Sequence, residues 1–268
     1  MTTRPSGDNS GPDGPSNGFI KQSLSLPDKG SEPASVAKPD GGGDLRQSFP
    51  PRLDILPAHQ KALWAGLHTV AEDGFVLYGG TAIALRLGHR VSVDFDFFRQ
   101  DPVNQDWLLS RYPFCLSATV IQAAPNTLSI LVPGEVGVVK LSFFGAITHG
   151  RVGNPSWTSD GVLEVASLAD LLATKLKTIQ QRVEKKDYLD IHAILAAGLR
   201  LDEGLASAQT LYGKTFHPMT ALKALIYHED GNLGELQFEV KKALIRAVAE
   251  IQEIPLPPRV HRTLRGEA

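Results

Sequence analysis

The chain has a single cysteine, two methionines and no long apolar run. The lone Cys115 cannot form an internal disulfide, which agrees with a reducing compartment, and we expect it to be a small buried residue rather than a catalytic thiol. No apolar stretch reaches the roughly 18 residues of a membrane-spanning helix. The N-terminus lacks the apolar core of a secretion signal. The sequence therefore predicts a cytoplasmic protein with no membrane partner.

A charge excess of either sign is also lacking, because 27 Lys and Arg residues oppose 29 Asp and Glu residues. The formal net charge of −2 gives no general attraction to nucleic acid, so any RNA contact requires a local basic patch. Of the 268 residues of the chain, 42% are hydrophobic, and the mean hydropathy is −0.09. Those values suit one sizeable domain, or a domain with a helical annex, plus a tail.

Composition divides the chain into three parts. Gly, Pro, Ser and charged residues dominate residues 1–51, where apolar side chains are too sparse to offset the entropy of ordering, so we predict a disordered tail. Residues 52–160 mix helical and strand patterns, and residues 161–268 are mainly helical. We therefore predict an α+β fold, with a small mixed sheet and its helices followed by a C-terminal helical unit.

Apolar spacing and turn residues place the individual elements. Helices are expected over residues 56–74, 81–88, 167–182, 185–198 and 236–252, and strands over 75–79, 91–98, 128–132 and 136–144. The last two strands are joined by the short turn 133–135, which predicts a hairpin.

Acidic and apolar residues alternate over 91–98, so Asp94 and Asp96 share one face of the expected strand. The apolar residues, which we expect to anchor the strand to a core, are Val91, Val93, Phe95 and Phe97. Carboxylates at i and i+2 can converge on a divalent cation, and such cations clamp the oxygens of an in-line phosphoryl displacement. The pair predicts a Mg²⁺ or Mn²⁺ site, and a solvated strand face is the alternative.

A strand-to-helix turn upstream predicts a phosphate cradle. Gly79 and Gly80 allow close backbone approach, and the helix that follows offers free amide donors and a positive dipole end. Thr81 could add a hydroxyl, and Arg90 is the best-placed cation for a phosphate. Together these residues predict binding of an NTP.

The order of these pieces resembles a known signature. Tyr78-Gly79-Gly80, followed after thirteen residues (81–93) by Asp94-Phe95-Asp96-Phe97, resembles the polymerase-beta-like nucleotidyltransferase superfamily. Residues 77–98 together with 175–195 resemble, more narrowly, the AbiEii/AbiGii toxin family of abortive-infection and toxin–antitoxin systems. The likeness continues through 217–230, and so covers about residues 52–250 without the tail.

The resemblance implies roles for further residues. Gly79, Gly80, Asp94 and Asp96 match the motif for phosphate cradling and metal binding. Lys175 matches a helix lysine that contacts the triphosphate, Asp187 matches an aspartate near the active site, and Asp190 falls one turn later. Surface lysines and ion pairs are the alternative reading of these three positions. The implied function is a toxin enzyme, with a cognate antitoxin, that transfers a nucleotide from an NTP to an acceptor hydroxyl, a tRNA in some members.

One departure from the superfamily concerns the third carboxylate that often stands on a neighbouring strand. The corresponding segment carries Lys140 and Ser142 on one face and no acid. Either another residue such as Asp187 is the general base, or the chain is a catalytically silent NTP- or RNA-binding module on the same fold. An enzyme that modifies a small molecule or a protein hydroxyl is a third hypothesis.

Overall fold

Strands and helices alternate in the first part of the computed structural model, which describes residues 47–135 and 137–266. The strands are β1 (Ser48–Phe49), β2 (Val76–Tyr78), β3 (Asp94–Phe98), β4 (Thr119–Ala124), β5 (Thr127–Gly134), β6 (Gly137–Phe144), β7 (Ser156–Thr158) and β8 (Glu164–Val165). The α-helices are α1 (Ala58–Trp64), α2 (His68–Glu72), α3 (Gly79–Leu87), α4 (Gln105–Arg111), α5 (Leu168–Thr178), α6 (Lys185–Ala196), α7 (Leu201–Tyr212), α8 (Pro218–Ile226) and α9 (Phe238–Ala249). The predicted α+β class is confirmed.

The described strands form one mixed sheet in the order β1-β7-β8-β2-β3-β6-β5-β4. Strand β3 pairs antiparallel with β2 and parallel with β6, and the predicted hairpin is confirmed as β5–β6. The β3–β6 register places Asp94 opposite Lys140 and Asp96 opposite Ser142. The two acids therefore stand near the middle of the sheet, where neighbours on both sides hold the backbone.

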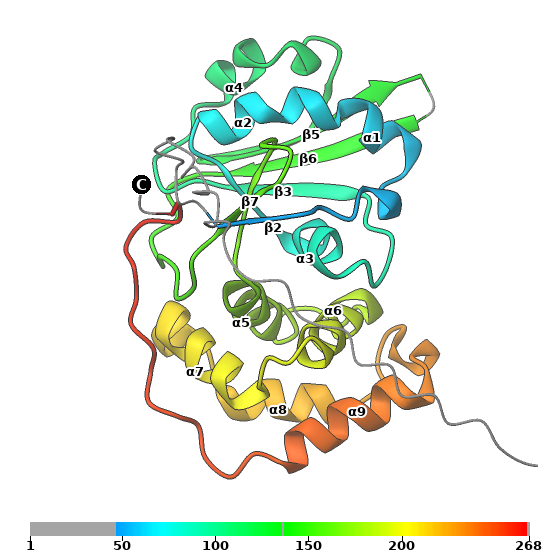
Figure 1. Cartoon of the computed structure of the whole chain (residues 1–268), viewed down its shortest axis with the longest axis vertical. Coiled ribbons are helices and arrows are strands. Elements are labelled where there is room, and N and C mark those ends of the chain that lie inside the picture. The colour runs from blue at the N-terminus through cyan, green and yellow to red at the C-terminus, as the bar shows by residue number, and fades with distance from the viewer. Residues whose placement is uncertain (1–46, 136, 267–268) are drawn as a thin grey trace, which may run out of the picture. The chain divides into compact units, whose positions relative to one another are not determined.

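Helices lie on both faces of the sheet (Figure 1), with α1 and α2 on one face and α3, α5 and α6 on the other. Phe95 and Phe97 are fully buried, and the Phe95 ring lies 6.4 Å from that of Trp64 on α1. Because successive side chains of a strand point to opposite faces, Asp94 and Asp96 project toward α3 and α5.

The predicted strand over 91–98 begins too early. Val91 and Val93 are 59% and 52% exposed, so they do not anchor the strand to the core. The segment before Asp94 is held outside the sheet by its polar side chains, because Arg90 reaches Asp190 and the Ser92 hydroxyl contacts Thr81. Only the second half of the alternating pattern is strand.

Other elements also differ from the predictions. Helix α3 begins at Gly79 rather than after the Gly-Gly pair, and Gly88 ends it in a left-handed conformation with φ of 65°. The helix expected over 56–74 is interrupted by a 3-10 turn at Ala65–Leu67. The elements that were not predicted are strands β1, β4, β7 and β8 and helices α4, α7 and α8.

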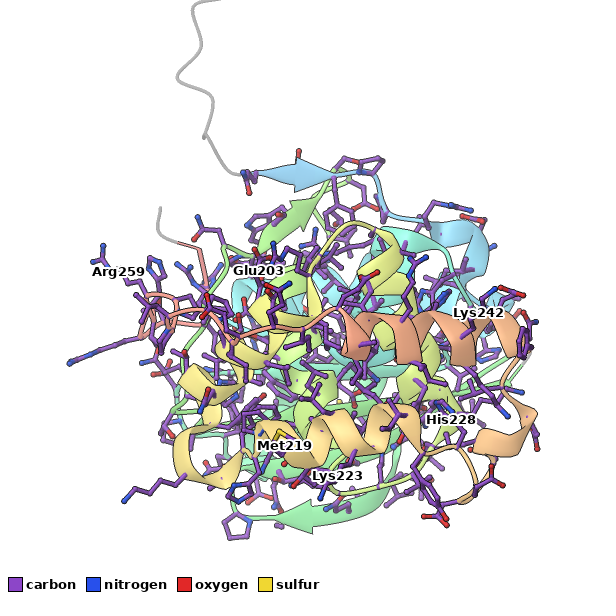
Figure 2. The ribbon with its side chains drawn as sticks, turned by 90° about the horizontal axis from the view of Figure 1, so that it is seen from below. Glu203, Met219, Lys223, His228, Lys242 and Arg259 are labelled. Atoms are coloured by element: carbon purple, nitrogen blue, oxygen red, sulfur yellow. The ribbon has the colours of Figure 1, made fainter. Side chains whose placement is uncertain are left out.

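The second part of the described chain is helical. Helix α5 begins with the predicted cap, since the Ser167 hydroxyl accepts the Asp170 N–H at 3.1 Å. Figure 2 shows α8 and α9 side by side, with Met219 and Lys223 on α8 and Lys242 on α9. None of the described helices is both long and apolar enough to cross a membrane.

The C-terminal segment that follows α9 returns to the sheet. His261 forms a backbone bridge with Arg151, and Arg265 donates to the Glu164 carboxylate at 3.0 Å. Leu264 between them is 2% exposed. The segment therefore completes the core at the β7–β8 side of the sheet.

The predicted tail, residues 1–51, falls mostly on residues 1–46, which lie outside the described residues. Its last residues include β1, which pairs with β7 through Ser48 and Phe49. The Cys115 side chain is buried, as predicted, and burial raises the pKa of its thiol to about 12.

Candidate functional site

The two carboxylates of β3 form the centre of the candidate site. Among the described residues, no hydrogen bond or ion pair engages the side chain of Asp94 or Asp96. Burial, and then repulsion by Asp94, raises the pKa of Asp96, whereas Lys140, Lys175 and Arg182 act in the opposite direction. Two neighbouring carboxylates with no bonded partner have the oxygen donors that a divalent cation prefers. The residues present fit a Mg²⁺ or Mn²⁺ ion.

The Gly79-Gly80 corner lies directly against this carboxylate pair. Gly79 has a positive φ of 74°, and a Cβ there would overlap the Asp96 carboxylate. A Cβ on Gly80 would overlap the end of the Arg90 guanidinium. The acids, the glycine corner and Arg90 therefore lie together, as predicted. The backbone amides in the first turn of α3 have no partners within the helix.

The Thr81 hydroxyl does not occupy the phosphate-binding position that was predicted for it. Its side chain is fully buried, and its hydroxyl contacts the Asp94 carbonyl oxygen and, at 2.9 Å, the Ser92 hydroxyl. These contacts hold the start of β3 to α3. The hydroxyl is therefore used in the frame of the site and does not face a bound phosphate.

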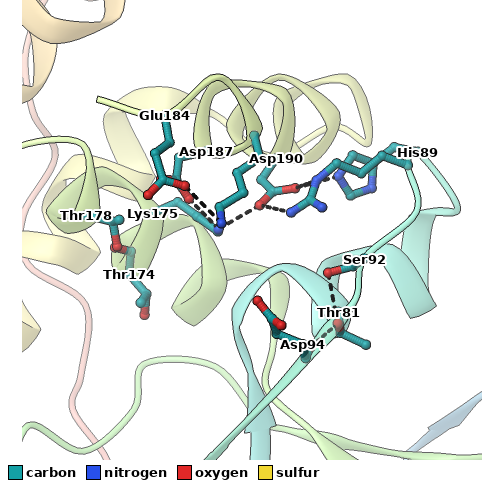
Figure 3. Close-up of polar contacts among 12 residues, drawn as sticks. Thr81, His89, Ser92, Asp94, Thr174, Lys175, Thr178, Glu184, Asp187 and Asp190 are labelled. Carbon is teal, nitrogen blue, oxygen red and sulfur yellow. Dashed lines mark hydrogen bonds and ion pairs between the residues drawn. The ribbon is translucent and has the colours of Figure 1, made fainter. Parts of the chain in front are cut away.

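Lys175 lies between two buried acids of α6 (Figure 3). Its Nζ atom is 2.7 Å from Asp187 Oδ1 and 2.6 Å from Asp190 Oδ2, and both aspartates are fully buried. Arg182 also donates to Asp187, at 2.9 Å and 3.1 Å. Burial alone would raise the pKa of Asp187, but the hydrogen bonds from Arg182 and Lys175 lower it overall. The reading of these residues as surface ion pairs is therefore wrong.

Asp190 joins α6 to the loop that precedes β3. Arg90 donates to both of its oxygens, at 2.7 Å and 2.8 Å, and His89 Nε2 lies 2.7 Å from Oδ1. Burial would raise the pKa of Asp190, but the bonds from His89 and Arg90 and the Lys175 charge bring it well below its usual range. Asp190 therefore holds in position Arg90 and Lys175, the two cations that were predicted to bind phosphate.

These groups surround a cavity of about 440 Å³. Its lining residues come from α3, the loop before β3, the sheet, α5 with the turn after it, and the start of α6: Gly79, Gly80, Arg90, Val91, Ser92, Val93, Asp94, Asp96, Phe98, Gln122, Ser129, Lys140, Ser142, Phe144, Thr174, Lys175, Thr178, Gln181, Arg182 and Lys186. The cavity thus combines two unpaired acids with several cations, which suits a metal-bound polyphosphate.

Sequence reasoning missed part of this lining. Thr174, Thr178 and Arg182 follow one another at intervals of four residues, which places them on one side of α5 and its continuation. That polar spacing was the available signal, but it is also the pattern of any solvated helix face. Only the position of α5 over β3 distinguishes the two readings.

A larger cavity of about 580 Å³ lies along α6, α7 and α9. Its acidic residues Asp202 and Glu250 are each paired with an arginine, Arg200 and Arg246. Because it offers no unpaired carboxylates, we assign the chemistry to the smaller cavity at β3.

Comparison with known proteins supports this assignment. Residues 62–123 match the model of the family described as "Nucleotidyl transferase AbiEii toxin, Type IV TA system". The resemblance to the AbiEii nucleotidyltransferase toxin family is confirmed. The matched AbiEii segment contains the glycine corner and both aspartates of β3, whereas Lys175 and Asp187 lie beyond it. Their roles stay predictions.

Two further similarities extend over more of the chain. An uncharacterized protein of Aquifex aeolicus (strain VF5) is 29% identical over 163 residues, which are 59% of this chain and 75% of that protein. The solved structure of MenT4, a nucleotidyltransferase toxin from Mycobacterium tuberculosis H37Rv, aligns with a TM-score of 0.49 and 14% identity. That alignment covers 72% of this chain and 83% of MenT4.

Proposed function

We propose that the chain is a metal-dependent nucleotidyltransferase that acts as the toxin of a type IV toxin–antitoxin system. It transfers a nucleotide from an NTP to an acceptor hydroxyl. The observation that carries the proposal is the unbonded Asp94–Asp96 pair, which lies against the Gly79-Gly80 corner and lines one cavity with Lys175. The AbiEii match, which covers the glycine corner and both aspartates, supports it.

Each residue has a physical role in this reaction. Asp94 and Asp96 hold a Mg²⁺ or Mn²⁺ ion, which compensates negative charge at the phosphates when bound. The Gly79-Gly80 amides and Lys175 bind the triphosphate, and Arg90 extends the positive wall. The acceptor oxygen forms a bond to the α-phosphorus and pyrophosphate leaves. Alignment and charge compensation, rather than covalent chemistry by the protein, lower the barrier.

We assign Asp187 to positioning and not to proton transfer. Both of its oxygens are bonded, to Lys175 and to Arg182, and its side chain is fully buried. A general base needs a free lone pair within reach of the acceptor hydroxyl. Asp187 instead fixes the Lys175 ammonium at the wall of the cavity.

The partners follow from the same proposal. An RNA such as tRNA is the proposed acceptor, and a cognate antitoxin is the proposed protein partner, as the type IV family description implies. Lys186 and Arg182 at the cavity rim are half-exposed cations that can meet an RNA phosphate.

The experiment is transfer of label from α-labelled NTPs to total tRNA, with Mg²⁺ or Mn²⁺. We expect wild type to label RNA, and Asp94→Asn and Asp96→Asn to be at least ~100-fold slower, the scale typical for loss of a key electrostatic group. Asp106→Asn is the matched control, because Asp106 is exposed on α4 and does not line the cavity. Equal labelling by wild type and the β3 variants would contradict the proposal.

A silent NTP-binding module remains the second candidate, and Ser142 is the observation that favours it. Ser142 on β6 pairs with Asp96 on β3, at the position where an acid would complete the site. The Ser142 hydroxyl lies 3.2 Å from that of Ser129. Binding of NTP and Mn²⁺ that depends on Asp96, without transfer to RNA, protein or small-molecule hydroxyls, would establish this function. Any transfer that Asp96→Asn abolishes would exclude it.

A further inference from the structure

A lysine stands on the strand beside the acidic pair. Lys140 on β6 lies directly opposite Asp94 in the parallel β3–β6 register, and its half-buried side chain lines the same cavity. Within the described part of the chain, no carboxylate or carbonyl oxygen bonds its ammonium group. The ammonium therefore lies beside the two carboxylates without a bonded acid, and it is free to contact a substrate in the cavity.

The same strand provides no further metal ligand. Ser142, opposite Asp96, is 2% exposed and bonded to Ser129. The described residues contain no group of three His, Cys, Asp or Glu side chains that could hold a metal ion. Two carboxylates suffice for one divalent cation shared with a triphosphate, but a second cation on the β6 side would meet the Lys140 ammonium with no acid to offset repulsion.

The sheet order separates two sides of the reaction. Strand β3 lies between β2, which leads into the Gly79-Gly80 corner, and β6, which carries Lys140. The proposed function has the triphosphate at the Gly79-Gly80 corner with Lys175, and this leaves the β6 side for the acceptor. In-line displacement needs positive charge at both the leaving and the attacking oxygen, which two metal ions often supply.

We propose that Lys140 supplies the positive charge on the acceptor side in place of a second metal ion, so that the site uses a single divalent cation. The inference rests on the proposed function and names a residue for its acceptor half. The acceptor oxygen bonds to the α-phosphorus, pyrophosphate departs with the electron pair of the broken P–O bond, and the hydroxyl proton passes to solvent water. The Lys140 side chain contacts the attacking oxygen.

The first test counts Mn²⁺ ions and needs no turnover. Electron paramagnetic resonance titration with a non-hydrolysable NTP analogue is expected to give one bound Mn²⁺ per wild-type complex. Lys140→Asp places a third carboxylate on β6 and removes the ammonium, so this variant should gain a second Mn²⁺. Two ions in wild type, or no gain in Lys140→Asp, would overturn the inference.

The second test measures transfer. Lys140→Met, which keeps the length and removes the charge, should lower kcat/KM by about 100-fold, the scale of one lost transition-state contact, while NTP affinity changes less than threefold. Lys140→Arg should recover part of the loss. Lys223→Met is the matched control, because Lys223 is an exposed lysine on α8 that does not line this cavity. Equal rates for the two Met variants would overturn the inference.

The two tests separate this inference from the proposed function. If wild type transfers nucleotides but binds two Mn²⁺ ions, the role of Lys140 fails and the proposed function stands. If no acceptor is labelled and the Mn²⁺ count still rises from one to two in Lys140→Asp, the proposed function fails, and Lys140 is retained as the residue that excludes a second cation.

Discussion

The Asp96 carboxylate lies against the backbone of Gly79, so that even a single carbon added at position 79 would overlap its Oδ2 atom. Gly79 begins α3, and Asp96 lies in β3. Tyr78, which ends β2 and directly precedes Gly79, is the register partner of Asp96. Phosphate cradle and metal site are therefore one structural unit, and a change in one displaces the other.

Gly79→Ala tests this unit. An alanine at φ of 74° is strained by about 1 kcal/mol, and its methyl group must also displace Asp96. We expect loss of Mn²⁺ binding and a fall in transfer of at least about 100-fold. Isothermal titration with Mn²⁺ and the labelling assay measure the two effects.

Gly161→Ala is the matched control, since Gly161 has a φ of 73° and no atom lies within 4 Å of its Cβ position. It should lose similar stability in urea and keep Mn²⁺ binding. If both variants lose stability alike and both bind Mn²⁺ as wild type does, the close approach of position 79 to Asp96 does not matter for Mn²⁺ binding.

Asp190→Asn removes the charge that holds Arg90, His89 and Lys175. Because the carboxylate is fully buried, loss of its charge leaves cations without their partner and should lower the free energy of unfolding by about 3–5 kcal/mol. Urea denaturation measures the change. The Asp101→Asn control removes an exposed ion pair with Arg99 and should cost about 0–1 kcal/mol. Equal midpoints for the two variants would show that the buried network does not stabilise the fold.

Stability should fall in acid because of the same residue. The pKa of Asp190 is held well below its usual range in the folded protein, so its contribution is fully present above the unfolded value of about 3.9. The contribution is lost as pH falls from there toward the folded pKa. We expect the gap in unfolding free energy between wild type and Asp190→Asn to be constant from pH 7 to about pH 5, and to shrink below about pH 4. A gap that grows in acid would contradict the assigned direction.

Arg182→Gln tests a cavity residue for which sequence analysis gave no assignment. The guanidinium donates twice to Asp187 and lines the cavity, so its loss should weaken NTP binding about tenfold, the effect of about 1.4 kcal/mol. Fluorescence titration with a labelled NTP analogue measures this affinity. Arg246→Gln, at an exposed position on α9 outside this cavity, should leave the affinity unchanged. Equal affinities in all three proteins would remove Arg182 from the site.

The glycine corner and the acidic pair could be predicted because their signals are local. A strand, a turn, a helix and a second strand follow one another within residues 75–98, and two-residue alternation fixes which side chains share a face. Asp94 and Asp96 therefore had to project together, whatever the rest of the fold. The same locality produced the error at Val91 and Val93, where the alternation continues but the backbone has left the sheet.

The network around Lys175 could not be predicted from periodicity. His89 and Arg90 meet Asp190 across 101 and 100 residues of sequence, respectively, so their contacts depend on how α6 packs against α3. On an isolated helix, Asp187 and Asp190 have the spacing of an ordinary exposed face, and only the family resemblance marked them. Their complete burial is a property of tertiary packing.

Because the C-terminal segment packs against the sheet, it affects the order in which parts of the fold form during synthesis. Arg151 is 1% exposed, and the carbonyl that accepts from its Nε atom belongs to Arg265, 114 residues further along. During synthesis the strands of the candidate site emerge long before that partner, so the Arg151 guanidinium lacks the Arg265 carbonyl until this segment has left the ribosome. For a protein proposed to arrest growth, the fold is therefore closed at its β7–β8 side only after residues 261–266 have been made.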